Sequence, residues 1–245
     1  MFRQTAYAAT LAAALLAFSQ PQAHAEETTL AAGAGFRKPL AELASVYKAQ
    51  SGHDILQVYG HIGQVIAQAR ENDSITLVCG DRAVLQRAKD IQFDSMARLG
   101  LGKLVIAYRK GVALARPEDI TRDDIKRIGI PDQASAIYGK AGRQFLERAK
   151  LGAAIDPKLI PVATVPQVTS YDVSGEVDAG FINATDAIGA GNSIGGFVEV
   201  DAALYDPVEV ACGVRSGGKP SAATKGFVDF LATDQARSII TRYGL

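Results

Sequence analysis

The sequence predicts an α/β protein of two lobes, in which each lobe is a mostly parallel sheet flanked by helices. Segments of strand and helix character alternate along the chain from about residue 28 onward, and this alternation is typical of parallel sheets. The alternation falls into two units, and no low-complexity linker separates them. The chain is 48% hydrophobic and 21% charged, so its apolar content is sufficient for a core in each unit.

Residues 1–25 have the composition of a secretory signal peptide. Arg3 supplies a positive charge, residues 11–18 form an apolar run, and Ala23-His24-Ala25 is a small-x-small cleavage pattern. The run is too short to cross a bilayer, and no later segment is long and apolar enough. We therefore exclude residues 1–25 from the fold and expect the mature chain to begin near Glu26, outside the cytoplasm.

The first unit alternates strands and helices three times. Leu40, Leu43, Ala44 and Tyr47 follow the spacing of one helix face, and Gly52 is a natural end for that helix. The expected strands are residues 28–34, 54–59 and 75–79. The expected helices are residues 36–50, 62–70 and 82–89.

The second unit repeats the pattern, and the chain then returns to the first unit. We expect strands at residues 104–108, 127–130, 159–163, 178–182, 196–200 and 208–214. We expect helices at residues 135–150, 165–173 and 185–188, a helical step at 117–126, and two helical stretches within 222–243. The strands at 104–108 and 208–214 are the natural crossings between units. Lobe 1 then comprises residues 26–103 and 208–245, lobe 2 comprises residues 104–207, and a cleft separates them.

Ligands of open parallel sheets bind beyond the carboxyl ends of the strands, where helices begin. Four such corners consist mostly of small or uncharged residues, which allow the backbone to approach a ligand closely. The corners are residues 33–37, 60–63, 132–136 and 164–168, with Asn183 at the next strand end. Simpler interpretations remain open: the glycines as turn residues, Ser135 as a helix N-cap, Arg37 as a solvated side chain and His61 as a turn residue.

Cys79 and Cys212 both lie in apolar stretches with strand character. We favour two buried free thiols, because free cysteine behaves as a small hydrophobic residue. A disulfide is the alternative, since the chain is expected in an oxidising compartment.

Composition and motifs argue against several functions. Lys+Arg and Asp+Glu each number 26, so the net charge is zero, and no basic cluster supports a nucleic-acid partner. The sequence lacks a Gly-x-Ser-x-Gly elbow, a P-loop and a His-Glu-x-x-His motif. We therefore do not expect an enzyme, and we expect no cofactor. A metal site at His61 would need a second ligand, for which Cys79 is the alternative considered.

The stretches "IPDQASAIYGKAG" at 130–142 and "FVDFLATDQARSIITRYG" at 227–244 resemble the periplasmic molybdate-binding proteins of ABC importers. The resemblance extends from about residue 28 to residue 245. It implies the type II periplasmic solute-binding fold, whose two lobes close on a tetrahedral oxyanion. It also implies a periplasmic location, an ABC permease in the inner membrane as partner, and a monomer.

The resemblance places the ligand positions of that family on residues that mostly lack its hydroxyls. Its serine positions fall on Gly35, His61 and Ile62, and its tyrosine falls on Asn183. Its two backbone donors in the second lobe fall on Ser135 and Val168. Arg37 and Gly63 complete our candidate set because they belong to the glycine corners.

We therefore expect a periplasmic solute-binding protein that captures a small oxyanion, molybdate-like or another anion, and delivers it to a permease. His61 is larger than the serine it replaces and can carry charge. One alternative is a secreted sensor or colonisation protein of the same fold. The other is a metal-binding protein that uses His61 with Cys79.

Overall fold

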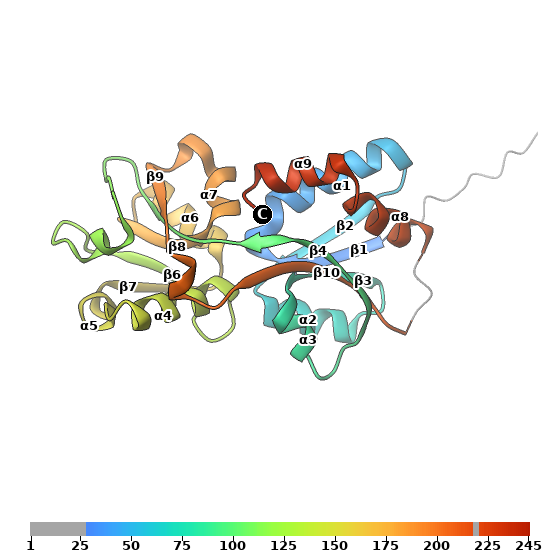
Figure 1. The fold of residues 1–245 in the computed structure, drawn as a ribbon, viewed down its shortest axis with the longest axis horizontal. Coiled ribbons are helices and arrows are strands. Elements are labelled where there is room, and N and C mark those ends of the chain that lie inside the picture. The colour runs from blue at the N-terminus through green and yellow to red at the C-terminus, as the bar shows by residue number, and fades with distance from the viewer. Residues whose placement is uncertain (1–27, 218–220) are drawn as a thin grey trace, which may run out of the picture.

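The computed structural model describes residues 28–217 and 221–245, so the predicted signal peptide lies outside the described residues. Two five-stranded sheets form the centres of two lobes that lie side by side, with helices on both faces of each sheet (Figure 1). The predicted two-lobe α/β architecture is confirmed. Within the described residues, no helix has the length and apolar character needed to cross a bilayer.

The sheet of lobe 1 has the strand order β2-β1-β3-β10-β4. Its strands are β1 (Thr28–Gly33), β2 (Ile55–Gly60), β3 (Ile75–Asp81), β4 (Phe93–Gly102) and β10 (Val208–Arg215). Its helices are α1 (Arg37–Ser51), α2 (Ile62–Glu71), α3 (Arg82–Arg87), α8 (Ala222–Leu231) and α9 (Asp234–Arg242), with the short helix η1 (Ala34–Phe36) before α1. β10 runs antiparallel to both of its neighbours, whereas β1 pairs in parallel with β2 and β3.

The sheet of lobe 2 has the order β7-β6-β8-β5-β9. Its strands are β5 (Leu104–Tyr108), β6 (Ile128–Pro131), β7 (Leu159–Val162), β8 (Ala179–Asn183) and β9 (Gly196–Glu199). Its helices are α4 (Ile137–Arg148), α5 (Gly152–Ile155), α6 (Val165–Ser174) and α7 (Ala184–Ala190), with short helices η2 (Pro117–Thr121), η3 (Asp156–Lys158), η4 (Gly191–Ser193) and η5 (Ala202–Leu204). β5 is the reversed strand here, so each sheet is mostly parallel with one antiparallel strand.

Helix α1 shows how the local pattern produces the fold. Leu40 and Leu43 are fully buried and Tyr47 nearly so, as their spacing predicts. Gly52 ends the helix with φ of 76°, a left-handed conformation that glycine adopts without steric cost. The predicted face and end of this helix are therefore confirmed.

Strand β4 was not predicted, because its sequence carries no clear alternation. Its residues Phe93–Gly102 include Asp94, Ser95 and Arg98, and its first half is largely exposed at the sheet edge. An edge strand buries little side-chain surface, so its hydrophobic signal is weak. It forms because β10 offers it a continuous antiparallel partner.

The chain crosses between the lobes at two places. β4 ends at Gly102 and β5 begins at Leu104, so the single residue Lys103 joins the two sheets on the way out. The chain returns through residues 200–207 into β10. A Cβ at Gly102 would lie 2.0 Å from the hydroxyl oxygen of Tyr138, so glycine is required where this tyrosine packs against the crossing.

Cys79 and Cys212 form a disulfide, so our preferred interpretation of them as free thiols is wrong. They lie directly opposite each other in the antiparallel β3–β10 ladder, with Cα atoms 4.0 Å apart, and both are fully buried. The cause is a tertiary pairing. All of lobe 2 lies between β3 and β10 in the sequence. With a separation of 133 positions between the cysteines, the sequence gives no indication that the two strands are neighbours.

Candidate functional site

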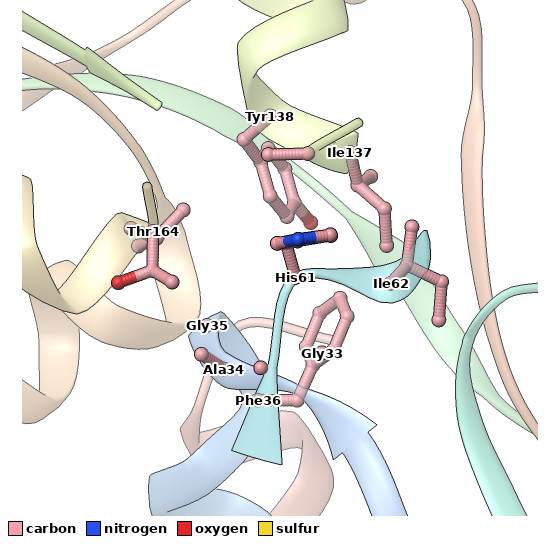
Figure 2. Close-up of a pocket in the computed structure, with 12 residues that line it drawn as sticks. Gly33, Ala34, Gly35, Phe36, His61, Ile62, Ile137, Tyr138 and Thr164 are labelled. Carbon is pink, nitrogen blue, oxygen red and sulfur yellow. The ribbon is translucent and has the colours of Figure 1, made fainter. Parts of the chain in front are cut away.

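A cavity lies between the lobes where four helix starts meet (Figure 2). Two of these starts belong to lobe 1: the first is η1 together with α1, and the second is α2. The other two, α4 and α6, belong to lobe 2. The cavity is lined by Gly33, Ala34, Gly35, Phe36, Gly60, His61, Ile62, Ala136, Ile137, Tyr138, Thr164 and Val165. None of these lining residues is Lys, Arg, Asp or Glu. Complementarity to an anion would therefore come from helix N-termini and His61.

The first corner is the turn from β1 into η1 and α1. No side chain caps the start of either helix. The N–H of Arg37 donates to Ala34 O, so the N–H groups without intrahelical acceptors are those of η1, and these can donate to a ligand. Gly35 is buried in this turn, and a Cβ on it would lie 3.0 Å from Oδ1 of Asn183. Glycine fits here because the Asn183 side chain from lobe 2 occupies the space of the missing side chain.

The second corner is the start of α2, where His61 is the N-cap. Its Nδ1 accepts a hydrogen bond from the N–H of Gln64 at 3.1 Å. An accepting Nδ1 carries no proton, so in the neutral ring the proton is on Nε2, which is a donor. The ring lies between the α4 residues Ile137 and Tyr138 and the η1 turn (Figure 2). His61 therefore caps its own helix and keeps one N–H for the cavity.

The two corners of lobe 2 are the starts of α4 and α6. Ala136 and Thr164 are the N-cap residues, and neither helix receives a side-chain cap. The N–H groups of Ile137 and Val165 therefore head their helices without intrahelical acceptors. Three of the four helix starts at the cavity thus lack a side-chain cap, and the fourth is capped by a histidine.

Tyr138 connects the cavity to the crossing between the lobes. It is 2% exposed, and its ring meets that of Phe36 from lobe 1 edge-on with 6.1 Å between centroids. Its hydroxyl has no hydrogen-bond partner among the described residues. Burial raises the pKa of this phenol well above its usual value, so the hydroxyl remains protonated and neutral. Sequence analysis missed Tyr138 because it lies inside a predicted helix and beyond the corner at residues 132–136.

The cavity has a volume of about 30 Å³, which corresponds to roughly two water molecules. The lobes are therefore close together in this structure. A small inorganic ion would need only a slight separation of the lining groups, whereas a branched organic anion would need a much larger one.

Of the candidates in lobe 1, Gly35, His61 and Ile62 line the cavity. Arg37 and Gly63 do not. The Arg37 guanidinium lies over the ring of Tyr59, 5.6 Å from its centroid, and the residue is exposed. Gly63 is exposed in the first turn of α2, next to His61. A position next to a glycine corner in the sequence therefore does not predict that a residue lines the cavity.

The candidates in lobe 2 lie near the cavity but outside its lining. The N–H and the hydroxyl of Ser135 both donate to Asp132 Oδ1, at 2.7 and 2.5 Å, and these bonds lower the pKa of Asp132. The N–H of Val168 donates to Thr164 O at 3.3 Å inside α6. Asn183 is fully buried, and its Nδ2 donates to Gly35 O at 2.9 Å. The residues of these two helix starts that line the cavity are Ala136, Ile137, Thr164 and Val165.

The metal alternative loses one of its two proposed ligands. Cys79 is bonded to Cys212, so it offers no thiolate beside His61. Nowhere in residues 28–217 and 221–245 do three or more His, Cys, Asp or Glu side chains cluster in a way that could hold a metal ion.

Comparisons with known proteins agree with this geometry. The chain is 26% identical over 249 residues to the molybdate-binding protein ModA of Rhodobacter capsulatus, covering 99% of this chain and 97% of that protein. The Azotobacter vinelandii periplasmic molybdate-binding protein has a similar structure, with a TM-score of 0.81 and 22% identity over 89% of this chain and 97% of that one. The sulfate-binding protein SubI of Mycobacterium tuberculosis has a TM-score of 0.71 and 15% identity over 89% and 85% of the two chains.

These matches confirm the two-lobe type II solute-binding fold and the resemblance to periplasmic molybdate-binding proteins. The relatives are solute-binding proteins rather than enzymes. The family model of the bacterial extracellular solute-binding proteins matches residues 28–245, and the chain belongs to that family.

Proposed function

We propose that this protein binds a small tetrahedral oxyanion in the cavity between its lobes and delivers it to an ABC permease. The observation that carries the proposal is the convergence of four helix starts, three of them without a side-chain cap, on a cavity whose lining contains no Lys, Arg, Asp or Glu. Helix N-termini with free N–H groups bind anions through hydrogen bonds and the helix dipole.

The lining chemistry favours an anion that carries no proton. The donors are backbone N–H groups, the Nε2–H of His61 and the hydroxyl of Tyr138, and no carboxylate lines the cavity. Molybdate, tungstate and sulfate at neutral pH present only acceptors. Hydrogen phosphate carries an O–H that needs an acceptor of its own, and leaving a buried donor unpaired costs about 1–3 kcal/mol. Phosphate should therefore bind more weakly than the others.

We propose that the protein acts in the periplasm, as a monomer with an ABC permease as partner. We assign residues 26–103 and 208–245 to lobe 1 and residues 104–207 to lobe 2. Two relatives support the proposed location, because both are molybdate-binding proteins and one of them is described as periplasmic.

A thermal-unfolding screen tests the ligand. Purified mature protein is unfolded with molybdate, tungstate, sulfate, phosphate, or small carboxylates, and chloride serves as the control. An anion at 100 times its dissociation constant should raise the free energy of unfolding by about 2.7 kcal/mol. The proposal predicts this for at least one unprotonated tetrahedral anion. Stabilisation by a carboxylate alone, or by none of the panel, would refute it.

A further inference from the structure

Lys38 of α1 reaches across from lobe 1 to α7 in lobe 2. Its Nζ lies 3.6 Å from Asp186 Oδ1 and donates to the backbone oxygen of Asp186 at 3.3 Å. The aliphatic part of the side chain packs on Gly189, where a Cβ would lie 2.0 Å from Lys38 Cδ. Lys38 therefore contacts lobe 2 through both its charge and its methylene groups.

A second contact between the lobes starts from the same end of α7. Asn183 donates through Nδ2 to Gly35 O, and its Oδ1 accepts from the N–H of Asp186 at 3.3 Å. One asparagine thus caps α7 and holds the η1 turn of lobe 1. Gly35 and Lys38 are three residues apart in lobe 1, as are Asn183 and Asp186 in lobe 2, so the two contacts are adjacent.

The position of Lys38 is unfavourable for its own helix. A cation in the first turn of α1 opposes the helix dipole, whereas Asp186 in the first turn of α7 complements one. The Asp186 side chain is only 5% exposed, and its other oxygen accepts from the hydroxyl of Thr169. A nearly buried carboxylate needs a partner, and Lys38 supplies it from the other lobe. Local helix stability therefore does not account for Lys38, but contact between the lobes does.

We propose that Lys38 and Gly35 of lobe 1, together with Asn183 and Asp186 of lobe 2, form an interlobe latch that holds the lobes closed. Lys38 and Asn183 do not line the cavity, so they act as positioning residues. Asn183 fixes the turn that supplies the first corner of the cavity, and Lys38 keeps α7 against α1. The effect on ligand release rests on the proposed function, but the effect on lobe closure does not.

The first test measures closure without any ligand. Small-angle X-ray scattering of the dialysed protein gives its radius of gyration. K38M removes the charge and keeps most of the aliphatic stem, and it should increase the radius of gyration because the lobes spend more time apart. The control is K48M, which removes an ion pair with Asp54 that lies on the surface of lobe 1. It should leave the radius unchanged.

Two further variants distinguish a latch from a general loss of packing. G189A would push the Lys38 side chain off α7 without changing any charge, so it should open the protein as K38M does. K38R keeps the charge and should restore the wild-type radius. Circular dichroism and thermal unfolding verify that each variant is folded. The latch is refuted if K38M and G189A have the radius of the wild-type protein.

The second test measures release of molybdate, used as the probe, by stopped-flow displacement with excess tungstate. A partly exposed ion pair is worth up to about 1 kcal/mol, so K38M should release molybdate about fivefold faster. K48M should match the wild-type rate. If the wild-type protein does not bind molybdate, the proposed ligand is wrong and the scattering result still decides the latch. Unchanged release from a protein that does bind would overturn the positioning role.

Discussion

Single residues determine what the cavity can offer a ligand, and His61 shows this most clearly. Its Nδ1 accepts from Gln64 N–H, which holds the ring at the start of α2 and leaves the proton on Nε2. A serine or asparagine could cap the same helix, but neither would place a ring N–H in the cavity. The histidine therefore combines a capping acceptor with a ring N–H beside the cavity, without requiring a positive charge.

Substitutions at His61 should separate the two roles. H61A removes both the cap and the donor, and should lower the free energy of unfolding by about 1 kcal/mol. H61N keeps a capping oxygen and should be nearly as stable as the wild-type protein. Both variants should bind molybdate about tenfold more weakly, since one neutral hydrogen bond is lost. Urea unfolding and calorimetry measure the two effects. Equal affinity of H61N and the wild-type protein would show that His61 is only a cap.

Asp172 is a buried acid outside the cavity. It lies in α6, is 1% exposed, and neither of its carboxyl oxygens has a hydrogen-bond partner among the described residues. Burial raises the pKa of this carboxyl to about 8. The folded state therefore keeps the proton over a pH range in which the unfolded state has already lost it.

This difference predicts that stability declines with rising pH. Between about pH 4 and pH 8 the folded state binds one more proton at Asp172 than the unfolded state, so the free energy of unfolding falls as pH increases and levels off above pH 8. D172N cannot ionise and should remove this part of the pH dependence, with the largest gain in stability near pH 8. D123N, at an exposed acid, is the control. Parallel pH profiles for D172N and the wild-type protein would contradict the assignment.

Residue-level inference from the sequence selected residues that line the cavity where the helix start itself was identified. His61 and Ile62 were placed because Gly60 marks the end of β2 and the helix begins at once. Ser135 and Val168 lie two and three residues from the lining residues Ile137 and Val165, and their roles as ligand donors stay predictions. Tyr138 could not be found, since its burial depends on Phe36 and Gly102 from distant parts of the chain.

Secondary-structure elements were predictable where their pattern is local. The alternation of strands and helices, and the glycine after α1, follow from nearest neighbours in the sequence. The reversed strands β5 and β10 and the edge strand β4 depend on which segments pair across the crossings. Hydrophobic periodicity does not show which strands pair. The interpretation of the two cysteines as free thiols was wrong for the same reason, because the pairing of β3 with β10 was not predicted.

The disulfide between β3 and β10 should contribute substantially to stability. By the chain-entropy argument, a bond that closes a loop of more than 100 residues stabilises the folded state by about 5 kcal/mol. The double variant C79A/C212A should lose about 4 kcal/mol or more in urea unfolding. Adding dithiothreitol should lower the stability of the wild-type protein in the same way and leave the double variant unchanged. A loss below about 1 kcal/mol would mean that the bond contributes little.

At the scale of the whole molecule, the expected processing defines the exported form. Protein recovered from the periplasm should have its amino terminus at or near Glu26, because Ala23-His24-Ala25 precedes it in a signal-peptide pattern. N-terminal sequencing measures this directly, and light scattering of the same material should give the mass of a monomer. Recovery of an intact Met1 would contradict the predicted cleavage.

The Cys79–Cys212 bond also makes a covalent ring of residues 79–212, and every strand of lobe 2 lies inside that ring. If the chain is exported as we propose, Cys79 emerges first and remains without its partner until the whole of lobe 2 has followed. The disulfide therefore forms only when β10 is available to pair with β3 in the sheet of lobe 1. In the finished protein, a single proteolytic cut anywhere in lobe 2 leaves both pieces attached to each other, and only reducing conditions separate them on a gel.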